Sequence, residues 1–327
     1  MKVTILIVNY NNWKDTIECL ESVFKSRYKD LEVIVVDNSP NDDSVNYLQE
    51  WAKGNIKIKQ TRFPELVYPE QKKPLDFILV SEKEFYNIHT KNNMTIVKAK
   101  SNNGFAAANN IVLKKLLKSN KDNSFVFLLN NDTVIPPDTI TNLINNYKNT
   151  NIGVAGCTLL EYNNPKKIQS VGGLYDDFWG ITSQVLEGVE LEEFKNQEGK
   201  VKIDYPVGAA MFLSTEVLKD IGVLNEEYFL YYEELDWIAN CRKKYETTYF
   251  DNCFVYHKGS SSIGANSKSY ISEKYSILNR IKFAKKYNRK FLTTVYAGVL
   301  LTIIKRFFSL RINLGFKLLK ELVNNEN

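Results

Sequence analysis

Short apolar segments that alternate with helical patterns constrain the fold of this chain more than any other feature. Val3–Val8, Leu31–Val36 and Phe125–Leu129 are almost wholly apolar. Between the first two, residues 13–24 place their apolar side chains on one helical face. Strands that are apolar on both faces and alternate with helices are typical of a parallel sheet covered by helices on both sides. We therefore predict an α/β fold.

The rest of the chain continues with mixed elements and one interruption. Residues 64–93 are rich in charge, proline and aromatic side chains and are longer than most loops, so we interpret them as an insertion. A helix is predicted over Tyr270–Tyr287, and the tail after it is apolar and basic. Further strands and helices are predicted at Ser44–Trp51, Thr95–Lys98, Ala106–Leu117, Val154–Leu160, Val207–Leu213, Thr215–Ile221 and Glu234–Lys244.

Cysteine usage and the N-terminal sequence indicate a cytoplasmic protein. The four cysteines show no paired short spacing, which favours reduced, buried thiols over a zinc site or a disulfide framework. The apolar run at the N-terminus is too short for a signal peptide and has no small-residue cleavage site. We expect no segment that is long and uncharged enough to span a bilayer. The cysteines are Cys19, Cys157, Cys241 and Cys253.

The C-terminal region carries the positive charge of the chain. Lys274–Lys320 contains twelve Lys or Arg and no Asp or Glu, which leaves the remainder net acidic. Within it, Val295–Ile304 is uncharged, is too short to cross a bilayer and is flanked by basic clusters. Such a pattern favours a helix in the membrane interface that is attracted to anionic headgroups. The alternative is a terminal helical hairpin with solvated cations, and no other feature supports a nucleic-acid partner.

Two of the predicted strands end in carboxylates. Asp37 follows Leu31–Val36, and Asn130-Asn131-Asp132 ends the strand Phe125–Leu129. Ligands of open α/β sheets bind beyond the carboxyl ends of the strands. Asp37 could accept a hydrogen bond from a pyrimidine base or form a helix cap, and Asp132 could hold a hard cation or form part of a turn.

Three further segments hold polar groups that suit a site. Asn102–Asn109 opens a helix with small residues, which suits either phosphate binding or packing on the sheet. Tyr228–Trp237 places three acids among aromatic residues, and one carboxylate there could have a raised pKa suited to general-base catalysis. The same acids also suit an ordinary first helical turn. His257 follows a strand-like segment and is either a metal ligand or structural.

Taken together and in this order, these segments resemble glycosyltransferase family 2. The resemblance implies the GT-A fold, a Rossmann-like nucleotide-binding sheet with helices on both faces fused to an acceptor-binding part. Here a helical, basic C-terminal tail would follow it. The subgroup that it resembles most is the bacterial rhamnosyltransferase-like one. The matching segments are Ile5–Asn11, Val35–Ser39, Asn102–Asn110, Leu128–Thr133, Val207–Phe212, Gly222–Trp237 and His257–Ser262.

The resemblance assigns roles to individual residues. Asp37 would bind the base, with Val8 and Tyr10 on either side of it. Asp132 would hold Mg²⁺ or Mn²⁺ with His257 as a second ligand. The donor-binding residues that it implies are Val8, Tyr10, Asp37, Asn103, Gly104, Asn130, Asn131 and Gly208.

On the acceptor side, Glu234 matches the general base of the family, with Glu233 and Asp236 as the neighbouring acids. Trp237 would offer an apolar face on which acceptor sugars stack. Two positions depart from the family pattern. Asn130 replaces the first acid of the Asp-x-Asp metal motif, and Asn240 stands where related sequences have an arginine.

The resemblance therefore implies an inverting, metal-dependent glycosyltransferase of the hexosyltransferase type. Its donor would be a UDP- or dTDP-sugar, with rhamnose as a candidate, and its acceptor a saccharide or lipid-linked saccharide in cell-surface polysaccharide synthesis. The catalytic domain would span residues 1–265, with a donor half (1–150) and an acceptor half (151–265), and residues 266–327 would attach it to the inner face of the cytoplasmic membrane. The alternatives are a nucleotidyltransferase that makes sugar nucleotides and a non-catalytic sugar-nucleotide-binding protein.

Overall fold

A computed structural model describes residues 1–88, 92–119, 123–148, 150–197, 199–259 and 270–326. The strands are β1 (Val3–Asn9), β2 (Leu31–Asp37), β3 (Phe77–Ser81), β4 (Met94–Lys98), β5 (Phe125–Asn130), β6 (Thr133–Val134), β7 (Ile152–Glu161), β8 (Ile168–Ser170), β9 (Gly173–Asp176), β10 (Ile181–Gln184), β11 (Ala210–Ser214) and β12 (Glu246–His257). The helices are α1 (Trp13–Phe24), α2 (Asp43–Lys53), α3 (Pro64–Val67), α4 (Glu82–Asn87), α5 (Gly104–Lys118), α6 (Thr139–Tyr147), α7 (Leu191–Lys195), α8 (Thr215–Ile221), α9 (Glu233–Cys241), α10 (Tyr270–Tyr287), α11 (Leu292–Phe308) and α12 (Ile312–Glu326), with a short 3₁₀ helix η1 (Arg289–Phe291).

One large sheet forms the centre of the molecule, in the order β3-β4-β2-β1-β5-β11-β7-β12-β6, with β8 paired to β7. β1 pairs in parallel with β2 on one side and with β5 on the other. Successive side chains of β1 point to opposite faces, so Ile5 and Ile7 enter one core while Leu6 enters the other. Burial on both faces explains why the strands are apolar throughout, and the predicted α/β class is confirmed.

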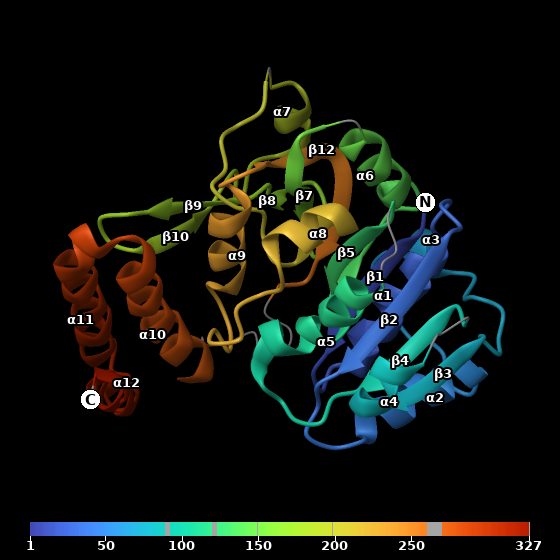
Figure 1. Ribbon diagram of the computed structural model, residues 1–327, viewed down its shortest axis with the longest axis horizontal. Helices are drawn as coiled ribbons and strands as arrows, with labels where there is room; N and C mark the ends of the chain where they lie inside the picture. The colour runs from blue at the N-terminus through green and yellow to red at the C-terminus, as the bar shows by residue number, and fades with distance from the viewer. Residues whose placement is uncertain (89–91, 120–122, 149, 198, 260–269, 327) are drawn as a thin grey trace.

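Helices cover both faces of this sheet (Figure 1). On one face, α1, α2 and α6 contribute Leu20, Leu48 and Leu143 to the core. On the other face, α5, α8 and α9 contribute apolar side chains such as Val112 and Leu218. The two helical layers hold the strands in place, so that their polar ends can project beyond the core.

The second half of the chain continues the same sheet instead of building a separate one. β11 pairs antiparallel with both β5 and β7, and β7 pairs in parallel with β12. β11 starts at Ala210 and not at the predicted Val207, because a turn closed by the Ala210 N–H and the Val207 carbonyl (3.2 Å) precedes it. Residues before and after position 150 therefore contribute strands to the same sheet.

The predicted insertion is part of the sheet. Within residues 64–93, β3 pairs in parallel with β4 and extends the sheet by one strand. Residues preceding β3 are tied to the core, because Lys73 Nζ lies 3.0 Å from Glu21 Oε1 and 3.6 Å from the ring centroid of Trp51. Residues 89–91 lie outside the described part of the chain.

The helices α10, α11 and α12 gather at the end of the molecule away from β3 (Figure 1). They share an apolar core that includes Ile281, Val299 and Leu318. The β9–β10 hairpin packs against them, and Arg280 Nε donates to the carbonyl of Trp179 (2.8 Å). The predicted helix Tyr270–Tyr287 is confirmed, whereas the predicted domain boundary at residue 265 lies outside the described residues.

One expectation about the C-terminal region is corrected. Arg289–Phe308, which joins η1 and α11, is a helical stretch of 20 residues whose most apolar 18-residue window has a mean hydropathy of 1.5, long and apolar enough to cross a membrane. Only 22% of its most apolar stretch is buried inside the protein. The sequence analysis missed it because it counted only the ten uncharged residues and not the aromatic and aliphatic residues on either side. Length and composition alone do not distinguish a spanning helix from one that lies on a surface.

Candidate active site

A cleft of about 930 Å³ opens at the carboxyl ends of β1 and β5. The first residues of α9 and the end of β12 form its other walls. This is the edge at which open α/β sheets bind their ligands. Of the residues predicted from the sequence, those that line it are Val8, Tyr10, Gly104, Asn130, Asn131, Asp132, Gly208, Glu233, Glu234 and His257.

One corner of the cleft pairs an aspartate with a histidine. His257 Nε2 lies 3.2 Å from Asp132 Oδ1, and both side chains are largely buried. The main chain holds them together, because β6 pairs with the end of β12 and the Lys258 N–H donates to the Asp132 carbonyl (3.0 Å). The other ring nitrogen of His257, Nδ1, lies 2.5 Å from Gln169 Oε1. A hydrogen bond at Nδ1 leaves Nε2 and its lone pair directed toward Asp132.

This pair fits a divalent cation. A carboxylate and a neutral imidazole are ligands that Mg²⁺ and Mn²⁺ accept, and Mg²⁺ sites at phosphates use few protein ligands. No group of three or more His, Cys, Asp and Glu side chains is placed to hold a metal within the described ranges. A cation bound by Asp132 and His257 would therefore need further ligands from a phosphate substrate and from water.

The opposite corner holds two adjacent glutamates at the start of α9. Glu233 is buried, and a carboxylate oxygen of each residue, Oε2, is buried without a hydrogen-bond partner in the described structure. Gly208 lies beside this pair, since a Cβ atom there would sit 3.9 Å from the Glu234 carboxyl group. The absence of a side chain at Gly208 keeps the Glu234 carboxylate open to the cleft.

Burial dominates the electrostatics of this acidic corner. Burial raises the pKa of Glu234, and burial together with the charge of Glu234 raises the pKa of Glu233 well above its usual range. The nearby hydroxyl of Tyr205 also has a raised pKa, chiefly because it is buried and also because Glu234 is close. Carboxylates in such surroundings accept protons readily near neutral pH.

At the end of the cleft formed by β1 and β2, Asn38 and Asn102 are the polar residues that the sequence analysis missed. Asn38 Nδ2 donates to Asn102 Oδ1 (2.8 Å), and Asn102 Oδ1 also accepts from the Gly104 N–H (3.1 Å). Gly104 is a glycine for steric reasons, because its φ is +95° and a Cβ atom would lie 2.2 Å from the Phe229 carbonyl oxygen. The predicted Asn103 is exposed, does not line the cleft and donates to Ser101 Oγ (3.0 Å).

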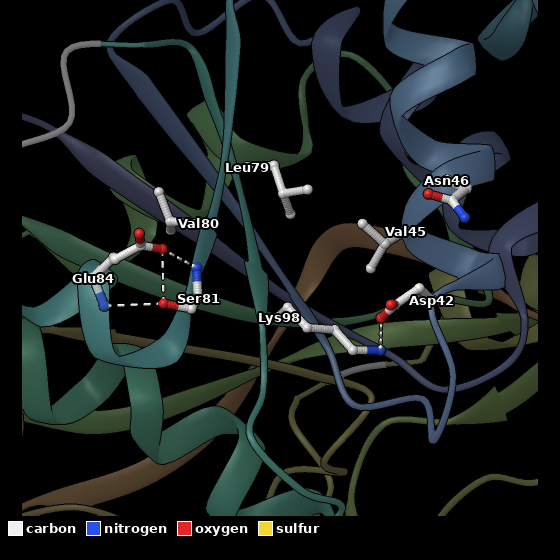
Figure 2. Close-up of a pocket in the computed structure, with 8 residues that line it drawn as sticks. All are labelled: Asp42, Val45, Asn46, Leu79, Val80, Ser81, Glu84 and Lys98. Carbon is white, nitrogen blue, oxygen red and sulfur yellow. Dashed lines mark hydrogen bonds and ion pairs between the residues drawn. The ribbon is translucent and has the colours of Figure 1, made fainter.

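Asp37 is not open to the cleft. Its side chain is fully buried, and its carboxylate accepts hydrogen bonds from Asn9 Nδ2 (2.6 Å), Ser39 Oγ (2.7 Å) and Lys98 Nζ (2.9 Å). Lys98 also faces a second cavity of about 350 Å³ between α2 and β3, where it pairs with Asp42 (Figure 2). In this structure Asp37 therefore ties together the ends of β1, β2 and β4, and its contact with a base stays a prediction.

Two predicted residues of α9 also point away from the cleft. Trp237 is 1% exposed in the core, and its Nε1 donates to the Gly222 carbonyl (2.8 Å). The prediction that sugars stack on Trp237 is wrong, because both ring faces are covered by protein. Asp236 is 2% exposed and pairs with Lys286 Nζ (2.6 Å), so it does not join the two glutamates as a catalytic candidate.

Gln169 and Tyr205 line the cleft but were not predicted. Neither lies in a motif: Gln169 is in the short strand β8, and Tyr205 lies in the connection that precedes β11. Only the pairing of β8 with β7 brings Gln169 beside His257. A sequence pattern carries no signal for such a contact.

Comparison with known proteins agrees with the fold. Residues 4–66 match the model of the family described as Glycosyl transferase family 2. Over 244 residues the chain is 22% identical to the low-salt glycan biosynthesis hexosyltransferase Agl10 of Haloferax volcanii. That alignment covers 74% of this chain and 62% of the length of Agl10.

Two solved structures share the architecture. One is the mannosyltransferase PcManGT of Pyrobaculum calidifontis in complex with GDP-Man and Mn²⁺, with a TM-score of 0.52 and 14% identity, covering 99% of this chain and 86% of that one. The other is GalNAc-T7 with UDP, GalNAc and Mn²⁺, with a TM-score of 0.59 and 12% identity, covering 90% of this chain and 50% of that one. At these identities the likeness concerns the fold alone. The fold is of the GT-A type, and residues 4–66 are similar to glycosyltransferase family 2.

Proposed function

We propose that this protein transfers a sugar from a nucleotide-diphosphate donor to an acceptor hydroxyl with inversion at the anomeric carbon. One observation carries the proposal. The cleft has a cation-compatible pair, Asp132 and His257, at one corner, and at another it has Glu233 and Glu234, each with one buried carboxylate oxygen that lacks a hydrogen-bond partner among the described residues. A direct displacement needs both functions, which are charge neutralisation at the leaving group and a base for the nucleophile.

Asp132 and His257 would hold Mg²⁺ or Mn²⁺ together with diphosphate oxygens. When bound, the cation would neutralise the charge that develops on the leaving diphosphate. His257 is kept in the ligating orientation by Gln169, and Asp132 by the main-chain pairing of β6 with β12. Asn130, which replaces the first acid of the family motif, lines the cleft and offers an amide oxygen instead of a second carboxylate.

Glu234 would act as the general base. Its carboxylate accepts the proton of the acceptor hydroxyl while that oxygen forms a bond to the anomeric carbon. The bond from the anomeric carbon to the diphosphate oxygen breaks, and its electron pair leaves with the nucleoside diphosphate. Attack from the side opposite the leaving group inverts the configuration. The raised pKa of Glu234 suits it to take up this proton near neutral pH.

The relatives support a nucleotide-sugar donor and a role in glycan synthesis. PcManGT was solved with GDP-Man and GalNAc-T7 with UDP, and Agl10 is named as a hexosyltransferase of glycan biosynthesis. We propose a UDP- or dTDP-sugar as the donor, with dTDP-rhamnose among the first to test. We propose a saccharide or lipid-linked saccharide as the acceptor, in cell-surface polysaccharide synthesis on the cytoplasmic face of the membrane.

A screen of sugar nucleotides against the full-length protein tests this function. We expect one donor to be consumed with Mn²⁺ or Mg²⁺ and a saccharide acceptor, with product formation abolished by excess chelator. Release of pyrophosphate from a nucleoside triphosphate and a sugar phosphate would instead identify a nucleotidyltransferase. Donor binding without turnover across the acceptor panel would identify a binding protein and contradict the proposal.

We further propose that α11 and α12 attach the enzyme to an anionic membrane surface. These helices and the connection between them expose apolar side chains, and Phe308 and Leu310 are 85% and 88% exposed. Residues with this exposure would be buried if they entered the interfacial region of a bilayer. We name this exposed region the apolar surface of α11 and α12; it consists of Leu300, Leu301, Ile304, Phe308, Leu310, Ile312, Phe316, Leu319 and Val323.

The charges around this surface favour anionic lipid over a second copy of the chain. Lys305, Lys317 and Lys320 are exposed on the same helices, and two such basic faces would repel each other. Each would contribute about 1 kcal/mol near an anionic surface. Other cations of the region are used internally, since Arg306 and Arg311 both pair with Glu273. An interfacial position suits α12, which packs on α11 and carries polar residues along its length.

Co-sedimentation with vesicles tests the attachment. We expect the full-length protein to sediment with vesicles that contain anionic phospholipid but not with neutral ones, and salt should weaken binding. Leu301→Glu combined with Phe316→Glu should leave the protein in the supernatant. Tyr47→Glu, at an exposed position of α2, is the matched control. The proposal would be contradicted if the wild-type protein did not bind anionic vesicles at low salt. It would also be contradicted if the wild type formed a dimer that the double variant abolished.

A further inference from the structure

The turn that delivers the two glutamates to the cleft has an unfavourable backbone conformation. Tyr231 and Tyr232 both have positive φ angles, 69° and 72°, and they immediately precede Glu233. Bulky residues adopt this left-handed region at a cost in free energy because the Cβ atom approaches the carbonyl oxygen. Such a conformation persists only where the surroundings hold it.

The main chain of this turn is held from outside by one side chain of α10. Asn279 Nδ2 donates to the Leu230 carbonyl (2.8 Å) and to the Tyr231 carbonyl (3.0 Å). Asn279 is 2% exposed, so these bonds form in a dry environment and their loss would leave buried carbonyls unpaired. Because both neighbouring groups are acceptors, the amide must present its NH₂ group to them.

The two bonded carbonyls belong to successive peptide units. Fixing both planes fixes the torsion angles between them, and with them the direction in which the chain enters α9. One carboxylate oxygen of each glutamate, Oε2, is buried with no hydrogen-bond partner among the described residues, and each carboxyl group is bonded to its own main-chain N–H. Their aim into the cleft, beside Gly208, therefore depends on the backbone of the turn.

We propose that Asn279 is a positioning residue for the transfer reaction. Its amide keeps residues 230–232 in the conformation that aims Glu234 at the acceptor hydroxyl. The inference rests on the proposed function, because it assigns Asn279 an effect through the general base. It predicts a loss in the chemical step without a loss of donor binding, since Asn279 contacts neither Asp132 nor His257.

The test compares Asn279→Ala and Asn279→Asp with the control Asn288→Ala in the full-length protein. Asn288 is also buried, at 5% exposure, and also donates to a carbonyl in another element, that of Asp177, but it does not contact the turn. We expect both Asn279 variants to lose about 10- to 100-fold in kcat, with the KM for the donor and Mn²⁺ affinity unchanged. Asn288→Ala should keep kcat within about twofold.

Hydrogen exchange of residues 229–234, measured by mass spectrometry, gives a readout independent of activity. We expect faster exchange in both Asn279 variants than in the wild type or in Asn288→Ala. The melting temperatures of the compared proteins should be similar, so that the difference reports on the turn and not on global unfolding. Unchanged exchange, or an equal loss of kcat in Asn288→Ala, would overturn the positioning role. If the wild type transfers no sugar, the proposed function fails, and the exchange comparison still decides whether Asn279 holds the turn.

Discussion

The two acidic corners of the cleft differ in how their negative charge is compensated. Asp132 lies against His257, whose ring is oriented by Gln169, so this corner is prepared to share charge with a cation. Glu233 and Glu234 face the cleft with buried oxygens that have no partner among the described residues, and their pKa values are raised. Acids of one cleft thus differ in their neighbours, which suits the first to the proposed cation and the second to the proposed proton transfer.

The largest expected effect is at Glu234. Glu234→Gln keeps the shape of the side chain but cannot take up the acceptor proton, so we expect kcat to fall about 100-fold or more. Donor affinity should be unchanged, because the metal corner is intact. The measurement is steady-state transfer together with calorimetric binding of the donor. Near-normal turnover would show that Glu234 is not the general base, and that either Glu233 or a residue outside this acidic corner acts instead.

A different signature is expected at the other corner. Asp132→Ala should remove most of the Mn²⁺-dependent affinity for the donor, and His257→Ala should weaken it less because a carboxylate remains. Titration of Mn²⁺ followed by electron paramagnetic resonance measures this directly, without turnover. Asp138→Ala, at a half-buried aspartate that pairs with Arg27, serves as the control. Equal Mn²⁺ binding in all variants would show that Asp132 and His257 do not form the cation site.

The third prediction concerns stability against pH. The pKa of Glu233 in the folded protein is raised well above the ordinary value of about 4.5, chiefly by burial and next by the charge of Glu234. Its protonated form favours folding below about pH 4.5, and that contribution is lost as pH rises toward the raised pKa. Glu233→Gln should therefore melt at a higher temperature than the wild type at pH 8, with the difference shrinking toward pH 4.5. A difference that is constant with pH would contradict the raised pKa.

The smallest effect is expected at Asp37. Since its carboxylate is buried and bound by Lys98, Asp37→Asn should act through the loop after β2. We expect donor affinity to fall by less than about tenfold and the melting temperature to decrease, as for other broken buried ion pairs. Differential scanning fluorimetry and donor titration measure the two changes. A large loss of donor affinity with an unchanged melting temperature would instead support a direct contact between Asp37 and the base.

The sequence predicted the elements well where burial alone determines them. Strands such as Phe125–Leu129 are apolar on both faces, and their carboxyl ends form the cleft, so Asp132 was placed correctly. Side-chain partners from distant segments could not be predicted, as with Lys98, which neutralises Asp37 across 61 residues. Trp237 was predicted to stack on sugars because it is a large aromatic residue next to acids. In the structure its ring is buried in the core, and its Nε1 donates to the Gly222 carbonyl.

The position of β3 has a consequence for how the protein behaves in solution. β3 closes one edge of the sheet, and it is short, lying between Pro74 and the charged residues of α4. Without it, the edge would be β4, in which Met94, Ile96 and Val97 are fully buried. Apolar strands with unpaired main-chain groups recruit strands from other molecules. We therefore expect a chain shortened by residues 64–93 to keep its cleft residues but to aggregate through the exposed edge of β4.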